Sequence, residues 1–131
     1  MNRLFELGIS DKEIKFMLEQ CSDILNMKDE EVIEKIDILK YIGCNMKQIK
    51  NIIVGNPYYL DRMNEDILKL ISYLKKIGLT SINLLFDSNP FFLNYDRFEV
   101  EEYINKKIDN GMDLDDVVYS IEDNPYIIDE D

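Results

Sequence analysis

The chain has 131 residues, of which 46% are hydrophobic, enough for one domain with a core of its own. Its 27 acidic and 15 basic residues give a formal net charge of −12, which repels nucleic-acid backbones at long range. The absence of histidine excludes Ser-His and Cys-His nucleophiles and imidazole metal ligands.

Five glycines and three prolines, against many Leu, Ile, Lys and Glu residues, predict an all-α fold. No apolar run approaches the roughly 20 residues of a membrane span, and the N-terminus lacks the layout of a secretion signal. We therefore expect a cytoplasmic protein that does not contact a membrane. Cys21 and Cys44 lie in apolar helical patterns, and we expect both to be reduced core residues.

The first expected element of each repeat is a helix that ends at a glycine. Apolar residues precede the glycine at the i, i+4, i+7 spacing of one helical face, as in Val32, Ile36 and Leu39. Glycine ends a helix because it adopts the left-handed conformation at little cost. These glycines recur at intervals of 35, 35 and 33 residues, as Gly8, Gly43, Gly78 and Gly111.

The second expected element is another helix, which follows each glycine. Ser10 with Glu13 and Asn45 with Gln48 have the spacing of a capping box, and Thr80 and Asp113 are expected to be lone caps. The buried faces follow the i, i+3, i+4 pattern and are expected to contain Ile14, Met17 and Leu18; Ile49, Ile52 and Ile53; Ile82, Leu85 and Phe86; Val117 and Ile121.

The third expected element is a corner, a short turn after the second helix. Its sequence is Asn-Pro followed by bulky residues, as in "VGNPYYLDR", "DSNPFFLNYDR" and "EDNPYIIDED". Pro57, Pro90 and Pro125 end the second helix, since proline lacks a backbone donor and moves the preceding residue out of helical dihedrals. A short 3₁₀ or α-helical turn would then aim one residue into the core. These expected core residues are Leu60, Leu93 and Ile128, with Leu25 in the first unit, which lacks Asn-Pro.

The three elements predict a helical-repeat solenoid of about four units, at residues 1–29, 30–63, 64–97 and 98–131 of one domain. Over essentially its whole length, the chain resembles the mitochondrial transcription termination factor (mTERF) family. The resemblance implies a solenoid of helix-helix-3₁₀ units that binds nucleic acid along a positively charged inner surface. The Ile, Asn and Lys bias, without an arginine-rich presequence, indicates a bacterial rather than organellar setting.

Aromatic residues directly after the prolines, with their companions Tyr59 and Phe92, are candidates for stacking on bases. The alternative, which we favour, is that large aromatics at the corners seal the seams between units. Basic residues near the corners and on the middle helices would hold a ligand if they gathered on one face; otherwise they form solvated surface. The candidate ligand-binding residues are Tyr58, Phe91, Tyr126, Arg62, Arg97 and Lys75.

No pattern predicts catalysis, a cofactor or a metal site. The acidic stretch from Asp109 fails as a calcium loop, because Leu114 stands where glycine is required and Ser120 where a bidentate glutamate belongs. Paired acids such as Glu101 and Glu102 point in different directions on a helix and have no identifiable catalytic partner.

The sequence therefore predicts a non-enzymatic binding or scaffold protein whose partner is another protein, as the net charge of −12 suggests. The alternative is nucleic-acid binding in transcription regulation, which the family resemblance implies. A first helix confined to residues 1–7 is too short to cover its own unit, so an apolar patch at the N-terminal end would allow homo-oligomerisation.

Overall fold

The computed structural model describes residues 2–130, and every regular element among them is helical. None of these helices is long and apolar enough to span a membrane. In chain order the elements are α1 (Asn2–Glu6), α2 (Asp11–Gln20), η1 (Ser22–Asn26), α3 (Asp29–Tyr41), α4 (Met46–Gly55), α5 (Tyr58–Asp61), α6 (Asn64–Lys76), α7 (Ile82–Ser88), η2 (Pro90–Asn94), α8 (Arg97–Asp109), α9 (Leu114–Asp123) and α10 (Ile127–Glu130). The predicted all-α class is confirmed.

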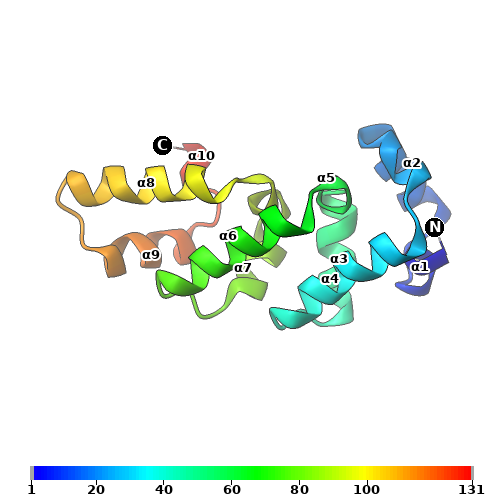
Figure 1. Ribbon diagram of the computed structural model, residues 1–131, viewed down its shortest axis with the longest axis horizontal. Coiled ribbons are helices and arrows are strands. Elements are labelled where there is room, and N and C mark those ends of the chain that lie inside the picture. The colour runs from blue at the N-terminus through cyan, green and yellow to red at the C-terminus, as the bar shows by residue number, and fades with distance from the viewer. Residues whose placement is uncertain (1, 131) are drawn as a thin grey trace.

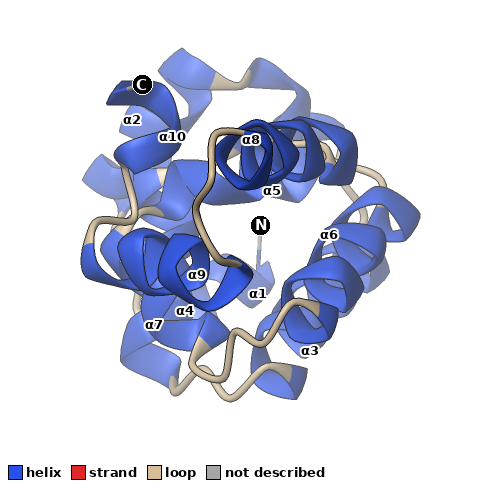
Figure 2. Ribbon diagram, turned by 90° about the vertical axis from the view of Figure 1, so that its left-hand side faces the viewer, coloured by secondary structure: helices blue, strands red, loops and turns tan. Residues whose placement is uncertain are grey.

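The helices form a stack of repeats that follow one another along the long axis (Figure 1). Each complete repeat has a first helix (α3, α6 or α8), a second helix (α4, α7 or α9) and a short corner (α5, η2 or α10). Like elements of successive repeats pack together: α3 contacts α6, α6 contacts α8, α4 contacts α7, and α5 contacts both η1 and η2. Figure 2 views this stack from its α8–α9 end, with the helices arranged around the long axis. The predicted helical-repeat solenoid is thus confirmed.

The first helices end at glycine, as predicted. Gly43 has φ +97°, its N–H donates to the Lys40 carbonyl at 3.0 Å, and the next N–H, of Cys44, donates to the Leu39 carbonyl at 3.0 Å. This pair of bonds is the Schellman arrangement, which satisfies carbonyls at the helix end. The same two bonds and positive φ recur at Gly8, Gly78 and Gly111.

The second helices confirm two of the predicted caps and correct the others. Ser10 with Glu13, and Asn45 with Gln48, form reciprocal capping boxes. Thr80 is not a cap, since Ser81 precedes α7 and makes no capping bond with its side chain. Asp113 occupies the cap position of α9, also without a side-chain capping bond. The third repeat is two residues shorter at this entrance, and α7 has seven residues where α4 and α9 have ten.

The predicted apolar faces form one continuous core across the repeats. Val32, Ile36 and Leu39 are buried, as are the residues predicted for the second helices, apart from Leu18, which is half-buried. Cys21 and Cys44 are buried and unpaired, and burial raises the pKa of the Cys44 thiol to about 11.

The corners confirm three of the four predicted core residues. Leu60 and Leu93 are fully buried and Ile128 is half-buried, but Leu25 is 62% exposed, and Ile24 is the buried residue of that corner. Within residues 2–130, η1 has a neighbouring corner on one side alone, whereas α5 lies between η1 and η2. The position that later corners bury is therefore open to solvent in the first.

Candidate functional site

The asparagines of the first two Asn-Pro phrases each connect their repeat to the next one by a hydrogen bond. Asn56 Nδ2 donates to the Pro90 carbonyl at 2.9 Å, and Asn89 Nδ2 donates to the Pro125 carbonyl at 2.9 Å. Both asparagine side chains are fully buried, where an unpaired amide would be costly. We did not predict these hydrogen bonds between repeats from the sequence, although the recurrence of Asn before Pro could have indicated them.

Arg62, one of the predicted ligand residues, is held by the following repeat. Its Nη1 donates to the carbonyls of Leu93 at 2.7 Å and Tyr95 at 3.0 Å, and its Nη2 lies 3.1 Å from Asp96 Oδ1. The side chain is only 15% exposed. This arginine would have to leave three partners to contact a ligand.

The corner aromatics divide into an exposed set and a buried set. Tyr58, Phe91 and Tyr126 are each between 43% and 47% exposed, whereas Tyr59 and Phe92 are fully buried and cannot stack on a ligand. Tyr126 Oη donates to the Ser88 carbonyl at 3.1 Å, across the seam between the third and fourth repeats. That contact fits the seam-sealing role for Tyr126. For Tyr58 and Phe91, both stacking on a ligand and sealing a seam stay predictions.

A groove of about 320 Å³ lies between α6 and α8. Lys69 and Lys76 of α6 and Arg97 of α8 all line it, together with Tyr73 and Glu101. The Arg97 guanidinium lies 6.0 Å from the Tyr73 ring centre and 3.2 Å from Glu101 Oε2. The groove thus combines three cations with an aromatic face and one carboxylate.

The groove continues into a second hollow of about 300 Å³, which shares Lys69 and Arg97. There Arg97 lies 5.0 Å from the ring centre of Phe98, which is 70% exposed, and Asp66 and Asp96 complete the lining. Arg97 therefore lies near two aromatic rings, those of Tyr73 and Phe98. A cation beside an exposed ring offers both charge and a stacking surface to a ligand.

Lys75, another predicted ligand residue, joins the last turns of two first helices. Its Nζ lies 4.1 Å from the Tyr41 ring centre and donates to Tyr41 Oη at 3.0 Å. Because α3, α6 and α8 run in the same direction, their last turns follow one another along the long axis (Figure 1). We call the lysines of these turns the lysine edge: Lys40, Lys75, Lys76, Lys106 and Lys107.

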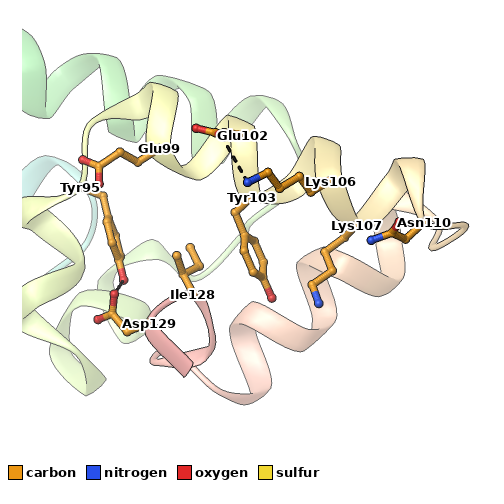
Figure 3. A pocket seen from close by; sticks show the side chains of 9 residues that line it. All are labelled: Tyr95, Glu99, Glu102, Tyr103, Lys106, Lys107, Asn110, Ile128 and Asp129. Atoms are coloured by element: carbon orange, nitrogen blue, oxygen red, sulfur yellow. Dashed lines mark hydrogen bonds and ion pairs between the residues drawn. The ribbon is translucent and has the colours of Figure 1, made fainter. Parts of the chain in front are cut away.

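A third cleft, of about 490 Å³, lies between α8 and α10 at the C-terminal end of the stack (Figure 3). Tyr95, Tyr103 and Ile128 supply its apolar surface. Tyr95 Oη donates a short hydrogen bond to Asp129, and burial together with this carboxylate raises the pKa of Tyr95. The remaining lining residues are charged or polar: Glu99, Glu102 and Asp129, and Lys106, Lys107 and Asn110.

Charge is unevenly distributed between the hollows along the first helices and the rest of the molecule. The hollows along α1, α3, α6 and α8 are lined by seven basic and eight acidic side chains. The chain as a whole carries −12. These hollows are therefore nearly neutral, and most of the acidic excess lies outside them. We call the surface formed by α3, α6 and α8 the first-helix face.

The N-terminal unit exposes large apolar side chains, as the short first helix suggested. Phe5 on α1, Phe16 on α2 and Leu25 on η1 are all about half exposed or more. Homo-oligomerisation through this end stays a prediction. Loss of a concentration-dependent dimer in a Leu25→Asp variant would support it.

Comparison with known proteins identifies a family. The mTERF family model matches residues 1–129 of the 131-residue chain. No curated protein and no solved structure matches it.

Proposed function

The chain belongs to the mTERF family, and from that premise we propose that it binds nucleic acid along the first-helix face without catalysing a reaction. The observation that carries this proposal is the convergence of Lys69, Lys76 and Arg97 on the groove between α6 and α8. The sequence alone left open whether any cations meet on one face.

The groove has the chemistry that a nucleic-acid strand needs. Lysine and arginine neutralise phosphates, and the planar guanidinium of Arg97 would hold two phosphate oxygens at once. Tyr73 and Phe98 flank this guanidinium and would accept a base on their ring faces. The lysine edge would extend the phosphate contacts along the stack.

The net charge of −12 opposes this function but does not exclude it. At physiological salt the Debye length is about 8 Å, so acids on the far side of the stack act weakly on this groove. Lys76 forms no ion pair within the described residues, and the Lys69–Glu65 pair is largely exposed. We therefore expect modest affinity that falls steeply with salt.

A protein partner, which the composition favours, is the second candidate. The observation in its favour is the cleft between α8 and α10, which has apolar walls and mixed charge. A non-enzymatic role and a cytoplasmic location remain part of the proposal.

The test is fluorescence anisotropy with labelled single-stranded and duplex DNA and RNA, over a range of salt concentrations. The combined substitution of Lys69→Glu and Lys76→Glu is expected to lower affinity at least about tenfold and to flatten the salt dependence. Lys12→Glu with Lys15→Glu on α2 changes the net charge equally but lies outside the groove, so it serves as the control. The proposal fails if no nucleic acid binds at low salt, or if both double variants lose affinity equally.

A further inference from the structure

The cleft between α8 and α10 lies where the next first helix of the stack would pack. α6 covers α3, and α8 covers α6, but within residues 2–130 no helix covers α8 in the same way. The cleft beside α8 has a volume of about 490 Å³, against about 320 Å³ for the groove between α6 and α8 (Figure 3).

Residue exposure shows which positions such a helix would cover. Leu70 and Leu74 of α6 are fully buried, and counted back from the closing glycine their places in α8 are taken by Tyr103 and Lys107. Both of these α8 residues are half-buried and line the cleft. The open positions on α8 are therefore those that the stack buries elsewhere.

The existing junctions show how an incoming helix is placed. Asn64, the first residue of α6, accepts a hydrogen bond of 2.6 Å from Lys35, in the middle of α3. Arg97, the first residue of α8, lies over Tyr73 in the second half of α6. An incoming helix on α8 would thus begin beside Glu102 and Tyr103 and run toward Lys106 and beyond.

We propose that this cleft docks a single amphipathic α-helix of a partner protein, in the place of a further first helix. Its first turn carries a basic residue, opposite Glu102, and an acidic residue one turn later lies opposite Lys106. Its apolar stripe packs on Tyr103 and Ile128. The site continues an interface that the chain already uses twice. It lies outside the groove between α6 and α8, and it shares Lys106 and Lys107 with the lysine edge.

The helix α8 provides the template for this charge pattern. Arg97 and Glu101, one turn apart on α8, both line the groove with Lys69 and Lys76 of α6. In the cleft, Glu102 occupies the place of Lys69, so a basic first residue meets an opposite charge. That complementarity favours an Arg-x-x-x-Glu pattern in the incoming helix.

A second copy of this chain is a poor occupant. The helix α1 is five residues long, whereas each first helix that covers another has thirteen. The helices α3, α6 and α8 of a second copy would already be packed within their own stack. These features disfavour a second copy, and the proposal commits to a helix from a different protein.

The probe is a helix-locked synthetic peptide with the sequence of residues 97–109, carrying an added tryptophan. The chain itself has no tryptophan, so the emission reports the peptide alone. We expect saturable binding, with backbone amide NMR shifts centred on Tyr95, Tyr103 and Ile128. In a control peptide, the residues corresponding to Arg97 and Glu101 are exchanged. This peptide is expected to bind at least about tenfold more weakly, a difference of about 1.4 kcal/mol.

Two protein variants locate the site. Tyr103→Asp removes apolar surface. Lys106→Glu, at an exposed position, breaks the surface ion pair with Glu102 and repels the acidic residue of the peptide. Each is expected to weaken peptide binding at least about tenfold. Tyr119→Asp, on the exposed surface of α9, is expected to bind as the wild type does.

Absent or non-saturable binding, equal binding of the exchanged peptide, or shifts centred elsewhere would overturn the proposal. A concentration-dependent dimer in sedimentation that Tyr103→Asp abolishes would also overturn it, since the occupant would then be a second copy. The Lys69→Glu, Lys76→Glu variant should bind the peptide normally, which separates this result from failure of the nucleic-acid proposal.

Discussion

The side-chain amide of Asn56 donates a hydrogen bond of 2.9 Å to the carbonyl of Pro90, the proline of the next repeat. Asn89 makes the same bond to Pro125. In the Asn-Pro phrase, asparagine therefore supplies a donor to the following repeat and proline supplies an acceptor to the preceding one. The recurrence of this phrase reflects the stacking of repeats as well as the termination of helices.

Replacing Asn56 by alanine is expected to lower the free energy of unfolding by about 1–3 kcal/mol, because the half-buried Pro90 carbonyl and the Asn94 side chain both lose their donor. Urea unfolding would measure the loss. Asn124→Ala is the matched control, since the Asn124 side chain donates to Glu130 and accepts from the Tyr126 N–H, both in its own repeat. Its cost should be under about 1 kcal/mol. Equal losses at both positions would show that the bond between repeats contributes little.

A proline at position 22 is expected to stabilise the first corner. Cys21 has φ −143° and ψ 90°, nearly the dihedrals of Asn89 before its proline, φ −137° and ψ 87°. Ser22 starts η1, as Pro90 starts η2, so Ser22→Pro fits the existing backbone. The gain should be about 0.4–1 kcal/mol from reduced freedom of the unfolded chain. A lower thermal midpoint than that of the wild type would refute this.

The fold was largely predictable because backbone constraints are local. Gly43 must adopt a positive φ, and Pro57 must interrupt a helix, whatever surrounds them. Leu25 was misplaced because its burial depends on a neighbouring corner that exists only in three dimensions. A position within a repeat specifies local geometry, but whether that position is covered depends on where the repeat lies in the stack.

The candidate site was less predictable because long polar side chains reach across repeats. Sequence placed Arg62 and Arg97 after corners but could not show that Arg62 binds carbonyls of the next repeat while Arg97 faces a groove. Three or four rotatable bonds separate such a charge from its backbone. The periodicity therefore predicted where the arginines lie in the repeat, but it did not predict which groups their side chains contact.

Arg62→Lys is expected to cost about 1–3 kcal/mol of stability although it keeps the charge. Arginine reaches the Leu93 and Tyr95 carbonyls with Nη1 and Asp96 with Nη2, whereas the three N–H donors of lysine share one nitrogen that would have to lie close to all three acceptors. Arg97→Lys is the control, because its ion pair with Glu101 is intrahelical and 41% exposed on the arginine side. Urea unfolding should leave that control within about 0.5 kcal/mol of the wild type. A similarly small effect of Arg62→Lys would contradict the bridging role.

Alkaline pH is expected to destabilise the fold partly through Cys44. Burial raises its pKa from the usual 9.0 to about 11, so between these values the unfolded chain releases a proton that the folded chain keeps. Stability therefore falls as pH rises through this window, by about 1 kcal/mol near pH 10. Cys44→Ala should make the decline of the urea midpoint shallower. An unchanged pH profile in that variant would exclude this contribution.

Lys35→Met is expected to raise stability, because a lysine occupies the place that Leu70 fills in the next repeat. The Lys35 side chain is 5% exposed, and burial lowers its pKa, although nearby Glu34 and Glu31 oppose that shift. The folded chain thus binds the Lys35 proton less tightly than the unfolded chain does. The charged lysine therefore lowers stability most at neutral pH, and this cost shrinks as the pH rises toward its usual pKa of 10.5.

Methionine would fill the same space without a charge, and Asn64 would keep its bond to Glu34. The gain should be about 1–2 kcal/mol in urea unfolding at neutral pH, shrinking toward pH 10. Lys28→Met, at an exposed position before α3, should change stability by less than about 0.5 kcal/mol. A net loss in Lys35→Met would mean that the 2.6 Å bond from Lys35 to Asn64 outweighs the cost of burying the ammonium group.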